Sequence, residues 1–130
     1  MKTTTVWKKD QQFKSFQDNN IIELDGNKKG GFSPKALLLS AVAGCSGIDV
    51  VEILNKMRVE FSDFEIDVEA DQTEEHPKVF KEILINYKIK TAKENADKVK
   101  KAIDLSLEKY CGVSAMLKKN SPIQYKLEIR

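Results

Sequence analysis

At 130 residues the chain is long enough to build one hydrophobic core and short for two, so we expect a single domain over residues 1–130. Hydrophobic residues make up 41% and charged residues 32%, which is ordinary for a soluble globular protein. The 22 basic residues nearly balance the 20 acidic ones and are interleaved with them. This balance argues against nucleic acid or an anionic membrane as a partner.

The first twelve residues are polar and lack the apolar core of a secretory signal. The most apolar stretch, residues 36–51, contains Ser40, Ser46 and Asp49 and is shorter than the roughly 20 residues that span a bilayer. We therefore expect a soluble, cytoplasmic protein. Thiols stay reduced in that compartment, so a permanent structural disulfide is not expected.

Strand patterns come first in the chain. Residues 3–8 and 12–18 are rich in β-branched and aromatic side chains and predict two strands, and residues 21–24 suggest a third. The segments Asp25-Gly26-Asn27 and Gly30-Gly31 have the composition of turns.

A long helix is predicted next, from Pro34 to about Arg58. Ser33 is suited to accept hydrogen bonds from the first turn, and proline fits the first helical position. Residues 36–51 are apolar on nearly every face of this helix, so we expect it to be buried on every side. One small sheet cannot cover it, which favours a second subunit or a sheet wrapped around it.

Two alternating segments follow, in which apolar side chains at 64–70 and 83–89 alternate with acidic and basic ones. They predict an antiparallel strand pair with oppositely charged outer faces. An amphipathic helix follows, with one apolar face that we expect to point into the core. Gly112 breaks this helix, and residues 113–119 predict a second, short helix. Residues 123–130 alternate between apolar and polar side chains and predict a last strand. Strands segregated from helices indicate an α+β fold. The predicted inward face of the amphipathic helix is Val99, Ala102, Ile103, Ser106 and Tyr110.

The two cysteines, Cys45 and Cys111, carry the candidate chemistry because a thiolate is a strong nucleophile. Cys45 lies inside the apolar helix between Gly44 and Gly47, which leave room for a partner or a ligand, and shares a helical face with Asp49 and Glu52. Its local sequence alone favours a buried small hydrophobe over a reactive thiol.

Cys111 directly precedes Gly112. It lies either at the start of a second short helix, where free amides favour the thiolate, or inside one unbroken helix. A zinc site needs three or four ligands, whereas the chain offers two cysteines and one histidine in a loop. We therefore expect no metal, and no motif indicates a cofactor.

Two segments resemble the cysteine motifs of the OsmC/Ohr family, which is named for osmotically inducible and organic hydroperoxide resistance proteins. The first is Gly31-Phe32-Ser33-Pro34 with Leu37-Leu38-Leu39-Ser40-Ala41-Val42-Ala43-Gly44-Cys45. The second is Ser106-Leu107-Glu108-Lys109-Tyr110-Cys111-Gly112-Val113-Ser114. The cysteine spacing of 66 and the order of elements fit the family over essentially the whole chain.

The resemblance implies an intertwined α+β homodimer with antiparallel sheets, long buried central helices and active sites at the subunit interface. It also implies thiol-dependent reduction of organic hydroperoxides in oxidative-stress defence. Cys45 would then be the peroxidatic thiol and Cys111 the resolving thiol. A dithiol such as a lipoyl group would reduce the resulting disulfide.

The chain departs from the peroxidase branch at two points. Lys35 stands where that branch has a glutamate, ten residues before the first cysteine. The only arginines are Arg58 and Arg130, so the amino-terminal strands lack the arginine that holds the thiolate. The chain thus resembles an OsmC-like branch, with Lys35, Asp49 and Glu52 as residues that could line the site. The alternative is a non-peroxidase protein that binds a small apolar molecule or a thiol metabolite in the dimer-interface cavity.

Overall fold

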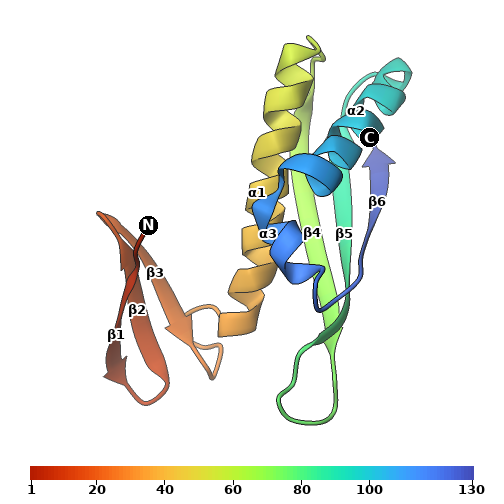
Figure 1. Cartoon of the computed structure of the whole chain (residues 1–130). Coiled ribbons are helices and arrows are strands. Elements are labelled where there is room, and N and C mark those ends of the chain that lie inside the picture. The colour runs from red at the N-terminus through yellow and green to blue at the C-terminus, as the bar shows by residue number, and fades with distance from the viewer. The chain divides into compact units, whose positions relative to one another are not determined.

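A computed structural model describes all residues from 1 to 130 and confirms the expected α+β class (Figure 1). The elements follow the predicted order, with bounds close to those read from the sequence. In chain order they are β1 (Thr4–Lys9), β2 (Gln12–Gln17), β3 (Asn20–Asp25), α1 (Pro34–Lys56), β4 (Ser62–Gln72), β5 (Phe80–Lys90), η1 (Lys93–Asn95), α2 (Ala96–Leu105), η2 (Ser106–Tyr110), α3 (Gly112–Leu117) and β6 (Ile123–Ile129).

The chain divides into two compact units, Met1–Leu39 and Ser40–Arg130. The first unit holds an antiparallel sheet in the order β1-β2-β3, in which Phe13 pairs with Trp7 and with Leu24. Every residue of β1 is exposed, and Trp7 retains 61% of its surface. In one chain, this sheet therefore leaves much of its apolar surface uncovered.

The loop after β3 is organised by a buried carboxylate. Asp25 accepts hydrogen bonds from the backbone N–H groups of Asn27 at 2.8 Å and Gly30 at 2.9 Å. These two bonds are the largest causes that hold the pKa of Asp25 below its ordinary value. The loop then returns to β3, where Phe32 forms a bridge with Leu24 just before α1 begins.

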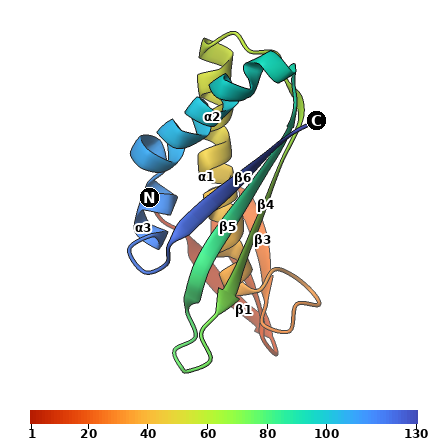
Figure 2. The ribbon, with the colours of Figure 1, turned by 90° about the vertical axis from the view of Figure 1, so that its right-hand side faces the viewer.

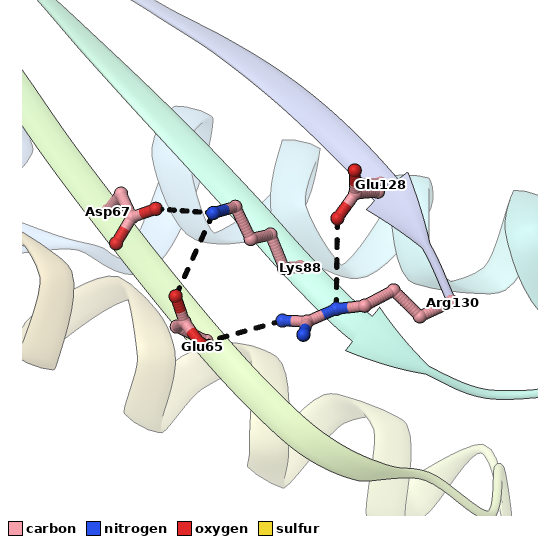
Figure 3. A network of polar contacts seen from close by, with 5 residues as sticks. All are labelled: Glu65, Asp67, Lys88, Glu128 and Arg130. Atoms are coloured by element: carbon pink, nitrogen blue, oxygen red, sulfur yellow. Dashed lines mark ion pairs between the residues drawn. The ribbon is translucent and has the colours of Figure 1, made fainter.

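The second unit holds a mixed sheet in the order β4-β5-β6. The pairing of β4 with β5 is antiparallel, as expected, whereas β6 runs parallel to β5 because the helical segments between them form a crossover connection. The predicted pairing of charges also holds: Lys88 lies 2.7 Å from Asp67 and 3.7 Å from Glu65, and Arg130 extends the cluster (Figure 3).

Helices cover one face of this sheet, as Figures 1 and 2 show for α2 and for α1 from Ser40 onward. The core comprises the inward side chains of β5 and single stripes of α1 and α2. The fully buried core side chains include Val42, Val50, Leu54, Ile83, Ile85, Tyr87, Ile89, Val99 and Ile103.

Helix α1 is buried along one stripe in the single chain, not on every side. Its buried residues recur every four positions, while Leu38 remains 44% exposed and Ile48 63% exposed. By length and composition alone α1 could cross a membrane, a test that the core helix of a soluble protein also passes. Its buried stripe includes the hydrogen-bonded Ser46, which is consistent with a core helix.

Candidate functional site

A π-helical turn positions Cys111. The segment η2 (Ser106–Tyr110) follows α2 directly, and its hydrogen bond runs from Cys111 N–H to the Ser106 carbonyl oxygen at 2.7 Å, five residues apart. A π turn adds one residue to a helical turn, so Cys111 takes the buried place that Tyr110 would hold in an α-helix. Cys111 is 3% exposed and Tyr110 is 55% exposed. The expectation that Tyr110 faces inward was therefore wrong.

The chain breaks from helical geometry at Cys111, which becomes the N-cap of α3. Its Sγ accepts a hydrogen bond from the Ser114 N–H at 3.3 Å, and the Ser114 hydroxyl donates to the Cys111 carbonyl oxygen at 3.0 Å. The structure therefore confirms the prediction that Cys111 lies at the start of a second short helix, and not inside one unbroken helix. Reciprocal bonds of this kind fix the cysteine backbone and its side chain together.

Burial is the main cause that raises the pKa of the Cys111 thiol above its ordinary value. Hydrogen bonds from the Ser114 hydroxyl and amide lower it, and a side-chain hydrogen bond with Cys45 raises it again. The amide of Ser114 thus partly offsets burial, but the thiol form of Cys111 is favoured overall. The two side chains thus interact with each other, and both cysteines are free thiols.

Cys45 lies in the middle of α1 and is half-buried, in contrast to the buried Cys111. Its next neighbour, Ser46, belongs to the fully buried stripe of the helix. The flanking Gly44 and Gly47 differ: a side-chain carbon at Gly44 would meet no atom, whereas one at Gly47 would lie 3.0 Å from Ile66 Cδ1. At Gly47 the absence of a side chain therefore lets α1 pack closely against Ile66 of β4.

A chain of polar side chains joins α1, β5 and η2 beside the two cysteines. The Ser46 hydroxyl lies 2.6 Å from the Tyr87 hydroxyl and 2.9 Å from Ser106 Oγ. Ser106 Oγ also donates to Asp49 Oδ2 at 2.9 Å. Ser46 and Ser106 are fully buried, and no buried side-chain polar atom in the chain lacks a partner. The network therefore satisfies every polar group that it brings into the core.

The network affects Tyr87 electrostatically. Burial is the main cause that raises the pKa of Tyr87 to about 12, and the hydrogen bond with Ser46 lowers it. The charges of Cys111 and Asp49 raise it further, which places the Tyr87 hydroxyl within electrostatic range of both groups.

An open apolar groove of about 620 Å³ runs between α1 and β4. Glu52 is its one charged lining residue and is exposed. Of the residues in the two sequence motifs, Ala43 and Gly44 line it. Its lining is Ala43, Gly44, Gly47, Ile48, Val51, Glu52, Phe64 and Ile66.

The residues predicted to line the site thus have different surroundings. Asp49 is half-buried and accepts from Ser106 beside the cysteines, while Glu52 belongs to the apolar groove. Lys35 is half-buried in the first turn of α1 and belongs to the first compact unit. No group of three or more His, Cys, Asp or Glu side chains in the chain is placed to hold a metal ion.

The sequence pattern placed Ser106 on an inward face but assigned no role to the buried hydroxyls of Ser46, Ser106, Tyr87 and Ser114. The signal that could have identified Ser106 was present, since it lies on the apolar face of an amphipathic helix. A serine at such a position must find a hydrogen-bond partner inside the core. Its partners come from elements far apart in the sequence, so the sequence could not name them.

Comparison with known families decides the family of the chain. The model of the OsmC family, described as OsmC-like protein, matches residues 26–126 and so includes both cysteines. The chain belongs to the OsmC-like family. The curated protein YhfA of Escherichia coli K12 is similar to this OsmC-like chain, with 40% identity over 110 residues that cover 83% of this chain and 81% of YhfA.

Solved structures with the same fold agree with this assignment. A hypothetical protein from Aquifex aeolicus VF5 has 31% identity and a TM-score of 0.88, with 99% of this chain and 95% of that chain covered. The organic hydroperoxide resistance protein OhrB of Bacillus subtilis has 19% identity and a TM-score of 0.63, with 99% and 96% covered. The second likeness shows the shared fold alone. Membership of the family suggests a role in redox chemistry or peroxide stress.

Proposed function

We propose that this OsmC-like protein is a thiol peroxidase that reduces organic hydroperoxides through Cys45 and Cys111. The observation that carries the proposal is the direct side-chain interaction of the two free thiols, which come from helices 66 residues apart in the sequence. The presence of organic hydroperoxide resistance proteins among the structural relatives supports the same chemistry.

The different surroundings of the two thiols support different roles. Cys111 is buried and its pKa is raised, so it is poorly suited to make the first attack on a peroxide. Cys45 is half-buried and therefore more open to a substrate. We assign Cys45 as the peroxidatic thiol and Cys111 as the resolving thiol.

The proposed cycle has three steps. The Cys45 thiolate attacks the terminal peroxide oxygen, the O–O bond breaks, and the alkoxide takes a proton to leave as an alcohol, with Cys45 as a sulfenic acid. The Cys111 thiol then attacks the Cys45 sulfur, its proton leaves with the sulfenic hydroxyl as water, and a disulfide forms. A small dithiol, such as a lipoyl group, reduces this disulfide and is itself oxidised to a cyclic disulfide.

The assembly proposed for this reaction is a homodimer in the cytoplasm. The uncovered faces of α1, with Leu38 and Ile48 exposed, and the exposed apolar side chains of β1 support a second subunit. A reducing compartment would keep Cys45 and Cys111 as the free thiols from which the cycle starts.

The experiment that tests the peroxidase is turnover of cumene hydroperoxide with a lipoyl dithiol as reductant. Wild type should consume the peroxide catalytically, and Cys45→Ser should abolish consumption. Cys111→Ser should still react once, because its Cys45 remains free to form a sulfenic acid that dimedone traps. Absence of peroxide consumption by wild type with every dithiol tried would reject the peroxidase.

The apolar groove between α1 and β4 favours a second candidate function, the binding of a small apolar molecule or a thiol metabolite. Its volume of about 620 Å³ lies within the range of ordinary small-molecule sites. Binding without catalysis predicts a ligand that co-purifies with the protein and is retained by Cys45→Ser. Ile48→Glu, which places a carboxylate in the groove lining, should release it.

A further inference from the structure

Ser106 holds both elements that carry the cysteines. Its side chain donates to Asp49 on α1 and contacts Ser46 on the same helix, each at 2.9 Å. Its backbone carbonyl oxygen accepts the N–H of Cys111 at 2.7 Å. One residue thus binds α1 with its side chain and the resolving cysteine with its backbone.

The two contacts on α1 lie within one helical turn after Cys45. Ser46 follows Cys45 directly, and Asp49 lies one helical turn beyond it. Two contacts at different points on α1 constrain both the distance between α1 and η2 and the rotation of α1 about its own axis. A single contact constrains only the distance. The Ser106 side chain therefore adds to the constraint that the buried stripe of α1 places on the orientation of Cys45.

We propose that Ser106 is a positioning residue for the redox pair, because its hydroxyl holds α1 at Ser46 and Asp49 while its carbonyl oxygen holds Cys111, so that the two sulfurs stay within bonding reach. This inference rests on the proposed function only in that it requires a Cys45–Cys111 disulfide. A disulfide forms over a narrow range of Cα separations, and a small displacement of one helix removes the pair from it.

The hydrogen bond between Ser106 and Ser46 of α1 lies in the buried core. Ser46 and Ser106 are fully buried, so water cannot replace a hydroxyl that is removed. Loss of the Ser106 hydroxyl leaves α1 held by its buried stripe and by the bond from Ser46 to Tyr87, but removes its polar contacts with η2. Positioning of reacting groups governs the effective concentration of one thiol at the other, and a shift of about 1 Å costs on the order of 100-fold.

The test measures this effective concentration without a peroxide. Reduced protein is equilibrated with mixtures of reduced and oxidised glutathione, quenched with acid, and read by intact mass. In the exchange, glutathione disulfide accepts two electrons and is released as two thiols, while Cys45 and Cys111 form one disulfide. The variants are Ser106→Ala, Asp49→Ala and Asp49→Asn, the last of which keeps an acceptor oxygen for Ser106.

The matched control is Tyr125→Phe. It removes the hydrogen bond of 2.7 Å from the Tyr125 hydroxyl to Asp104 Oδ1, which links β6 to α2 and not to α1. This variant loses a hydroxyl between two elements, as Ser106→Ala does, without touching the contacts around Cys45. It should keep the wild-type exchange constant.

Ser106→Ala and Asp49→Ala should lower the exchange constant about tenfold or more, and Asp49→Asn should restore most of it. If Ser106→Ala does not fold, the half-buried Asp49 variants carry the test. Folded Ala variants with the wild-type constant would overturn the inference, as would a wild type that forms no Cys45–Cys111 disulfide at any glutathione ratio. A wild type that forms it but ignores hydroperoxide would reject the peroxidase alone and leave the inference standing.

Discussion

The backbone N–H of Cys111 donates to the carbonyl oxygen of Ser106, five residues earlier, at 2.7 Å. This single π-helical bond determines which side chain of the helix end faces the core. Ser106 is fully buried and Cys111 is 3% exposed, while the three residues between Leu107 and Cys111 are exposed. The site therefore depends on one additional residue in a helical turn.

Deletion of the exposed Glu108 should leave Cys111 in the core. After the deletion, the N–H of Cys111 and the carbonyl oxygen of Ser106 are four residues apart instead of five. The same two groups can then form an ordinary α-helical hydrogen bond. Unfolding in urea should show a stability within about 1 kcal/mol of wild type, and the thiol should stay protected from iodoacetamide in the native protein. Insertion of one alanine after Glu108 is the matched control, since it turns Cys111 by about 100° away from the core. Equal protection in both variants would contradict this account of the turn.

The hydroxyl of Tyr87 should make the folded protein sensitive to strongly alkaline pH. Its pKa is raised to about 12, mainly by burial, so the folded state holds this proton more tightly than the unfolded chain does. The resulting stability is fully present below the ordinary value of 10.0 and is lost as pH rises toward about 12. The loss is at most about 3 kcal/mol.

Urea unfolding between these two pH values measures that loss. Tyr87→Phe should be less stable than wild type at neutral pH and should show a flatter dependence above pH 10.0, because the titrating hydroxyl is absent. An unchanged slope in this variant would assign the alkaline sensitivity to other groups.

Asp25 should stabilise the loop before α1 only while it is ionised. Its carboxylate accepts the amides of Asn27 and Gly30, and these bonds hold its pKa below 3.8. A depressed pKa gives stability that is present above 3.8 and lost as pH falls through the lower folded value. Asp25→Ala should lower the urea midpoint at neutral pH, and Asp25→Asn, which keeps one acceptor oxygen, should lower it less. The difference between Asp25→Ala and wild type should shrink in acid, and a constant difference would contradict the role of the charge.

The ion pairs on the outer face of the second sheet should contribute little to stability. Lys88, Asp67 and Glu65 retain 32%, 52% and 56% of their side-chain surface, so water screens their attraction (Figure 3). Lys88→Gln should cost less than about 1 kcal/mol in urea unfolding at low salt, and nearly nothing at high salt. A larger cost that persists in high salt would indicate that the cluster has a packing role.

Much of the fold could be predicted because local chemistry and the hydrophobic pattern agree. Ser33-Pro34 predicted the start of α1 at Pro34, and alternation predicted β4, β5 and β6. The direction of β6 could not be predicted, because an alternating strand reads the same in a parallel and an antiparallel ladder. The structure divides the chain into two compact units, and the prediction of one domain over residues 1–130 stays a prediction.

The candidate site was predictable only in part. The motifs around Cys45 and Cys111 predicted a redox pair, which stays a prediction, and Gly112 correctly indicated a break in the helix. The inward place of Tyr110 was wrong because spacing rules assume an unbroken α-helix, and no local pattern marks a π turn. The Ser106 contacts arise only when two distant helices pack together. The roles of Lys35, Asp49 and Glu52 stay predictions.

The most direct test of the thiol pair is one stoichiometric oxidation. Reduced protein is mixed with one equivalent of cumene hydroperoxide, and its thiols are counted by intact mass, a non-reducing gel and peptide mapping. The account predicts rapid loss of two thiols in a monomer-sized band, with a peptide that links Cys45 to Cys111. Persistence of both thiols, or a disulfide between chains, would contradict it.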